Sequence, residues 1–271
     1  MSAISSRPRV KSVAAAAAPI AAVLAARVFA AAWRSLSAAA KQAYRHSVAA
    51  VPPVAAQAPK AIPAMPAFRR SFALPENLTA VEKVQVSTML ALATTPCMVE
   101  GPGGLRQQLE SLQRSRSLDE AQQSQQALFD TLASSHRDLF ERSLGEACAK
   151  AAVEAGFSQV EFDRSRPGEL RVIATDPAGR SLVTEIGALP SGEASLATEV
   201  VGVRDGSCGQ ILDRFDATLE RLGVHAGPPH RRSTGGVCEL AAARDLLRKK
   251  ALGPVRRAER LNQPASARSN S

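Results

Sequence analysis

The stretch from Ser181 to Gly223 carries the clearest succession of secondary-structure signals, and it restricts the fold most. It begins with two β-rich runs, 182–186 and 196–203, which a turn containing proline and glycine separates. A second turn, at 205–209, is followed by apolar residues at helical spacing. The pattern predicts two strands and a helix that buries one apolar face on a small sheet.

The predicted helix has recognisable ends. Ser207 is a suitable N-cap, and Gln210, three residues later, completes a capping box. Gly223 can adopt the left-handed conformation in which many helices end. We therefore expect the helix to run from about Ser207 to Gly223.

Residues 199–223 also carry a family resemblance. The run Glu-Val-Val-Gly-Val-Arg-Asp-Gly-Ser-Cys-Gly, followed by a helix ending in Leu-Gly, resembles a short bacterial domain family of unknown function. Genes of that family often lie near ring-forming AAA-type ATPases, so the resemblance implies such an ATPase as a partner. It covers about a tenth of the chain, and it brings no assigned catalytic residues.

Further elements precede this stretch and complete an α+β domain at about 104–224. Residues 159–162 and 169–175 resemble strands joined by hairpin-type turns. Residues 105–156 predict a helical hairpin with a break near Ser117, which can cap its second helix with Glu120. We expect a mostly antiparallel sheet of three to four strands with helices packed on one face. Residues 76–103 predict a short helix, capped by Asn77 or Thr79, and a linker.

Both ends of the chain are basic. The net charge is +9, yet no Asp or Glu precedes Glu76. Residues 1–75 form an Ala/Pro-rich low-complexity arm, and 225–271 predict a short basic helix and a polar tail. Disordered flanks are the simpler interpretation. Anionic partners, meaning nucleic acid, anionic lipid or an acidic protein face, are the alternative.

An amphipathic helix is predicted at 27–45, with Phe29, Trp33 and Leu36 on its apolar face and basic residues opposite. It could dock on this protein or a partner, lie on an anionic membrane, or belong to an organelle transit peptide. A secretory signal peptide fits less well, because the alanine-rich segment that would form its hydrophobic core is only weakly hydrophobic. No apolar run reaches membrane-spanning length.

The candidates for chemistry are few. Cys208 lies at a predicted helix start, where a thiolate is stabilised, although a small buried residue at a tight turn explains it equally. The four cysteines lie far apart and predict no zinc site, so we expect buried or idle thiols in a reducing compartment. The expected location is the cytoplasm, with an organelle reached by an N-terminal transit peptide as the alternative. We expect no metal, no cofactor and no catalytic residue. Basic residues of the C-terminal part are candidate anion contacts: Arg231, Arg232, Lys249, Lys250, Arg256 and Arg257.

The acidic residues have an ordinary explanation. The predicted helix carries two arginines together with Asp213, Asp216 and Glu220, which we interpret as its solvated face. The leading functional hypothesis is therefore a non-enzymatic accessory or adaptor protein that binds another protein. A nonspecific nucleic-acid-associated protein acting through the basic ends is the alternative, and an enzyme using Cys208 is the third hypothesis.

Overall fold

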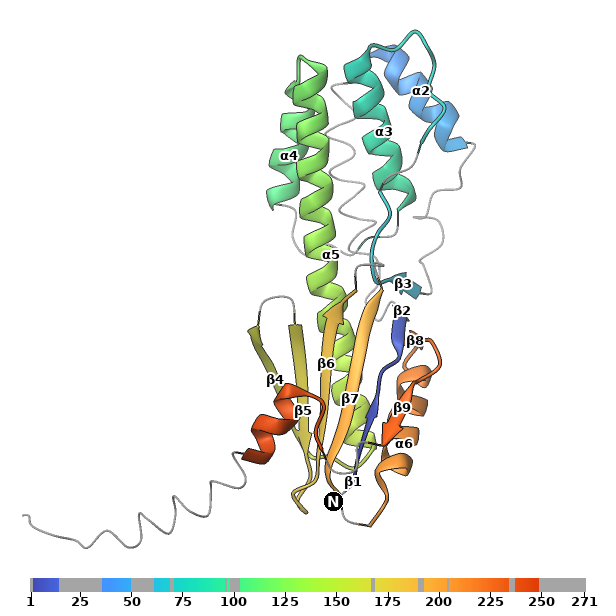
Figure 1. Cartoon of the computed structure of the whole chain (residues 1–271). Coiled ribbons are helices and arrows are strands. Elements are labelled where there is room, and N and C mark those ends of the chain that lie inside the picture. The colour runs from blue at the N-terminus through green and yellow to red at the C-terminus, as the bar shows by residue number, and fades with distance from the viewer. Residues whose placement is uncertain are drawn as a thin grey trace, which may run out of the picture.

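A computed structural model describes residues 2–14, 36–49, 61–68, 71–95, 97, 103–166, 169–189, 193–203, 205–233 and 237–248. A bundle of helices stands on a β-sheet (Figure 1). The helices are α2 (Ala38–Ala49), α3 (Ala80–Thr94), α4 (Gly103–Arg114), α5 (Leu118–Glu154), α6 (Cys208–Arg221) and a C-terminal helix at 241–248. The strands are β1 (Ser2–Ser6), β2 (Arg9–Ala14), β3 (Ala61–Pro63), β4 (Gln159–Arg166), β5 (Glu169–Thr175), β6 (Ser181–Ala188), β7 (Ala194–Val203), β8 (His225–Ala226) and β9 (Arg231–Ser233). The predicted α+β class is confirmed.

All the described strands belong to one sheet, and every pairing found between them is antiparallel. The main strand order is β3-β2-β7-β6-β5-β4, with β1 between β7 and β9 and with β8 beside β2. The strands predicted from the sequence are confirmed as β4 to β7, which follow one another as hairpins. The expected sheet of three to four strands is too small, because segments near both basic ends join it.

The N-terminal residues are part of the sheet. In β1, Ser5 lies opposite Glu199 of β7, and Val10 of β2 is fully buried. The low-complexity composition predicted a disordered arm here. That prediction is wrong for residues 2–14, because pairing with a strand almost two hundred residues away supplies order that local composition does not show.

A β-bulge in β7 lets both Val200 and Val203 face the interior. Regular alternation would place these two side chains on opposite faces of the sheet, yet both belong to the main core. Between them Gly202 has a φ of +83°, and an added Cβ would lie 3.1 Å from the carbonyl oxygen of Gly179. The pairing of β1 with β7 shifts at the same place.

The longest helix, α5, joins the bundle to the sheet. Its 37 residues span about 55 Å at 1.5 Å per residue. Ser117 and Glu120 form the predicted capping box, and Gly156, just after the helix, has a φ of +104°. The predicted break between α4 and α5 and the helical hairpin are therefore confirmed.

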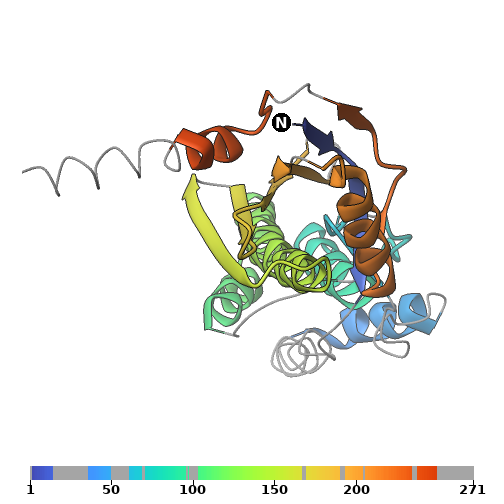
Figure 2. The same ribbon diagram turned by 90° about the horizontal axis from the view of Figure 1, so that it is seen from below.

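The two faces of the sheet are covered differently, as Figure 2 shows from below. The inner face carries Leu170, Leu182 and Ile186, which share one core with residues of α5 and α6. The outer face carries Val183 and Val201, which pack with the C-terminal segment, residues 237–248. Helices therefore pack on both faces and not on one, as the sequence had suggested.

The helical bundle has its own apolar clusters. Leu36, Ala40 and Ala43 pack against α3, which agrees with a helical face that docks on this protein. Phe29 and Trp33, the other predicted members of that face, lie outside the described residues. Thr79 caps α3 through a full capping box with Glu82, which confirms one of the two predicted caps.

Candidate protein-binding edge

Strand β4 forms one border of the sheet. It pairs with β5, and none of the other described strands pairs with it. In Figure 1 it is the leftmost strand of the sheet. A border strand has a row of backbone N–H and C=O groups directed away from the sheet, and these groups can pair with another extended chain.

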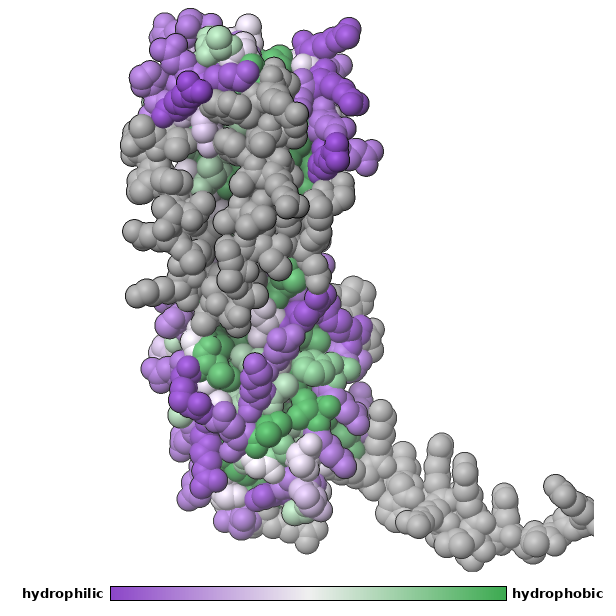
Figure 3. Space-filling view, turned by 180° about the vertical axis from the view of Figure 1, so that it is seen from behind, coloured by the Kyte–Doolittle hydropathy of each residue, from purple (hydrophilic) through white to green (hydrophobic). Residues whose placement is uncertain are grey.

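Two large apolar side chains are exposed on β4 and on α5, the helix under the sheet. Phe162 of β4 and Val153 of α5 are each 54% exposed. An added Cβ on Gly145 of α5 would lie 3.4 Å from the Phe162 ring, so Phe162 lies over that glycine. Gly145, Ala149 and Val153 recur every fourth residue and therefore share one face of α5. Figure 3, seen from the side of α5, shows hydrophobic residues at the surface of the sheet-bearing half.

The outer face of the same strand is acidic. Glu161 is exposed, and Asp163 lies 3.5 Å from the guanidinium of Arg171 on β5. Arg171 is buried and also contacts Glu169 at 3.2 Å and Glu185 at 3.4 Å. One guanidinium thus faces three carboxylates.

Cys208, the candidate reactive thiol, lies in the core. It begins α6 and is fully buried among the residues that join the sheet to α5 and α6. A nucleophilic thiol needs an accessible sulfur, so this position favours the structural explanation. Ser207 occupies the N-cap, but the predicted capping box with Gln210 is wrong: the Ser207 hydroxyl donates to Asp205, whose carboxylate also accepts from the Ser207 backbone N–H.

Two of the candidate anion contacts bind carboxylates of this chain. Arg231 lies 2.5 Å from Asp213 and 2.7 Å from Asp216, which ties β9 to α6. These two carboxylates are therefore not simply a solvated face. Arg232 lies 3.8 Å from Glu239. Lys249, Lys250, Arg256 and Arg257 lie outside the described residues.

A buried carboxylate anchors the C-terminal segment. Glu199 of β7 is fully buried and accepts hydrogen bonds from the backbone N–H of Glu239 at 3.1 Å and of Leu240 at 2.9 Å. Burial raises the pKa of Glu199, and the two backbone N–H groups oppose that shift. Cys238 lies beside it, and burial, followed by the Glu199 charge, raises the pKa of its thiol to about 11. This arrangement holds the residues just before the C-terminal helix on the sheet and offers no exposed reactive group.

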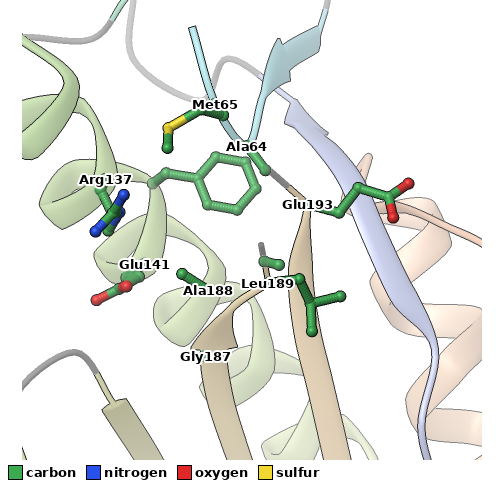
Figure 4. A pocket seen from close by; sticks show the side chains of 10 residues that line it. Ala64, Met65, Arg137, Glu141, Gly187, Ala188, Leu189 and Glu193 are labelled. Atoms are coloured by element: carbon green, nitrogen blue, oxygen red, sulfur yellow. The ribbon is translucent and has the colours of Figure 1, made fainter. Parts of the chain in front are cut away.

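A small hollow lies where the bundle meets the sheet (Figure 4). It is lined by residues of α5, of the ends of β6 and β7 and of the segment after β3. Its volume of about 20 Å³ has room for roughly one water molecule. Glu141 on its wall has a buried Oε1 without a hydrogen-bond partner among the described residues, and burial raises its pKa. The hollow is too small to hold an organic substrate.

The described part of the chain contains no group of three or more His, Cys, Asp or Glu residues arranged to hold a metal ion. None of its helices is long and apolar enough to cross a membrane.

The sequence did not reveal the candidate edge, although it predicted β4. The alternation Val160, Glu161, Phe162, Asp163 sets two apolar residues on one face and two acidic ones on the other. That alternation was a usable signal for a strand with two chemically distinct faces. It does not say that the strand is a border, because strand order depends on contacts with the rest of the chain.

Comparisons with known proteins identify no relative. No protein-family model, no curated protein and no solved structure matches this chain significantly.

Proposed function

We propose that this protein is a non-enzymatic adaptor that binds a partner protein at the β4 edge. The observation that carries the proposal is the exposed Phe162 on a border strand beyond which no other described strand lies. Exposed apolar side chains beside unpaired strand edges are aggregation sites unless a partner covers them. Charged residues on β4, Glu161 and Arg164, limit indiscriminate pairing while leaving Phe162 accessible.

The elongated form of the molecule supports an adaptor. The sheet carries the β4 edge, and the helical bundle extends from the other end of α5 (Figure 1). A molecule built in this way can present two separate surfaces. The resemblance of residues 199–223 implies a ring-forming ATPase as the partner, which makes such an ATPase the first candidate to test.

The test is affinity capture of the tagged full-length chain from native lysate, with nuclease and high salt. We expect one stoichiometric protein partner that survives both treatments. Phe162→Asp should lose this partner, because it places a charge in an apolar contact. Val237→Asp, a change at an apolar residue that is more accessible, at 70% exposed, should retain it. Capture of nuclease-sensitive material alone, or equal capture by both variants, would contradict the proposal.

Nucleic-acid association through the basic ends is a second candidate function. The net charge of +9 and the dense Lys/Arg content of 248–257 favour it, whereas the ion pairs of Arg231 and Arg232 weaken it. Binding to random duplex DNA should then fall steeply with salt and require residues beyond 248. Absence of a salt-dependent signal would remove this function.

A further inference from the structure

The β4 edge has two chemically distinct faces, and these restrict what can add to it. On the inner face, Val160 is partly buried against the core and Phe162 is exposed over α5. On the outer face, Glu161 and Asp163 extend a carboxylate cluster around Arg171. The C-terminal helix packs on the outer face over β5, β6 and β7, and none of the apolar residues that it contacts lies on β4.

We propose that β4 binds an extended peptide in which apolar residues alternate with Lys or Arg, and that this peptide adds to the sheet as a further strand. This inference rests on the proposed adaptor function and names its partner class. Main-chain hydrogen bonds provide affinity in strand addition, and side chains that alternate between the two faces provide specificity. The apolar side chains of the peptide would contact Phe162 and the Gly145–Val153 face of α5. Its cationic side chains would lie beside Glu161 and Asp163.

A second copy of this chain is disfavoured at the edge in the three registers that centre on the acidic stretch of β4. In such a dimer the two β4 strands would pair antiparallel, related by a twofold axis perpendicular to the sheet. One residue of β4 would then lie directly opposite its own copy, and the outer faces of the two sheets would lie on the same side. With Glu161 or Asp163 at the centre, that residue lies opposite its own copy. With Phe162 at the centre, Glu161 lies opposite Asp163. Each of these registers places carboxylates directly opposite one another, which is destabilising.

The experiment uses three labelled heptapeptides and the full-length protein. The first is Lys-Val-Arg-Val-Lys-Val-Arg, the second has the same composition in block order, and the third replaces its cations with Glu and Asp. Fluorescence anisotropy should show that the first binds tightest, because it alone satisfies both faces of β4. Hydrogen exchange should slow at the amides of 159–164 in its presence and stay unchanged in α6.

Variants with matched charge changes then locate the binding. Glu161→Lys should weaken binding of the first peptide about fivefold, because an ion pair is lost and a like-charge contact replaces it. Glu220→Lys on α6 makes the same change at an exposed site on a different element, and it should alter binding less than twofold. Both variants should unfold at the wild-type temperature.

Three results would overturn the inference. One is block-order peptide binding as tight as that of the alternating peptide, and another is unchanged exchange at 159–164. The third is sedimentation that shows a concentration-dependent dimer that Phe162→Asp abolishes. If the lysate partner is captured in a way that Phe162→Asp abolishes, but the alternating peptide does not bind, the adaptor function stands and strand addition fails. If the peptide binds β4 while no partner is captured, the adaptor function fails instead.

Discussion

At the scale of single residues, Glu199 connects the sheet to the C-terminal segment. Its carboxylate accepts two backbone hydrogen bonds in a fully buried position. Glu199→Ala should lower the free energy of unfolding by about 2–3 kcal/mol, because it leaves two backbone N–H groups without an acceptor. Glu199→Gln keeps an acceptor oxygen and should cost clearly less. Urea denaturation measures both, and equal losses would show that these hydrogen bonds do not hold the segment.

Gly202 is the residue that most constrains the backbone of β7. Gly202→Ala should lower the free energy of unfolding by about 2 kcal/mol, because alanine is strained at positive φ and its Cβ would approach the carbonyl oxygen of Gly179. Gly209→Ala is the matched control. It lies in the first turn of α6 with open space around the added Cβ, and its stability should be unchanged or higher by up to about 1 kcal/mol. A tolerated Gly202→Ala would contradict the bulge.

At the scale of elements, substitutions in the N-terminal strands can test whether this basic, low-complexity segment is part of the folded sheet. Val10 is fully buried in β2, whereas the next residue, Lys11, is exposed. Val10→Ala should lower the free energy of unfolding by about 2 kcal/mol through the cavity that it leaves. Lys11→Ala should change it by less than about 0.5 kcal/mol. Similar values for the two variants would show that residues 9–14 are not packed on the sheet.

Local patterns predicted the elements that local forces define. The run 169–175 coincides with β5, and Thr79, Ser117, Gly156 and Gly223 mark helix ends as expected. Each of those signals acts over a few residues. The strands β1, β2 and β9 were missed because their partners lie far away in the chain. The pairing of Arg231 with Asp213 and Asp216 was also missed, because it depends on the position of β9, which pairs with β1 at the other end of the chain.

The candidate site, too, could be predicted from the sequence only in its local features. The strand that carries Phe162 was predicted, and its alternating faces can be read from the sequence. The position of β4 at the border of the sheet could not be predicted from the sequence. A series of hairpins from β4 to β7 leaves room for a further strand next to β4 as well as next to β7. The acidic outer face also depends on Arg171 and Glu185, which reach Asp163 only across paired strands.

At the scale of the whole molecule, α5 makes the bundle and the sheet one structure. Leu128 belongs to a cluster of the bundle, whereas Leu144 and Cys148 belong to the core under the sheet. Between them lies His136, fully buried, with its Nε2 atom 2.7 Å from the carbonyl oxygen of Pro63 in β3. A carbonyl only accepts hydrogen bonds, so Nε2 carries the proton and the neutral ring can make this contact.

This contact makes stability depend on pH. Burial lowers the pKa of His136, and the contact with Pro63 opposes part of that shift. The unfolded chain therefore binds more protons between the lowered pKa and about 6.5, and stability falls as pH drops below about 6.5. His136→Gln should lose less stability than the wild type between pH 7.5 and 5.5. Raised pKa values at Glu141 and Glu199 act in the opposite sense, but they are common to both proteins. Parallel urea midpoints for the two proteins would contradict this role.

The most direct test of the account is photocrosslinking from the β4 edge in the cell of origin. A photoreactive phenylalanine derivative would replace Phe162 in one sample and Val237, the most exposed large apolar residue in the described part of the chain, in another. The account predicts one dominant crosslinked partner protein from position 162, with its attachment in an extended segment of alternating apolar and basic residues, and little product from position 237. Equal products from both positions, or crosslinks from 162 only to a second copy of the chain, would contradict it.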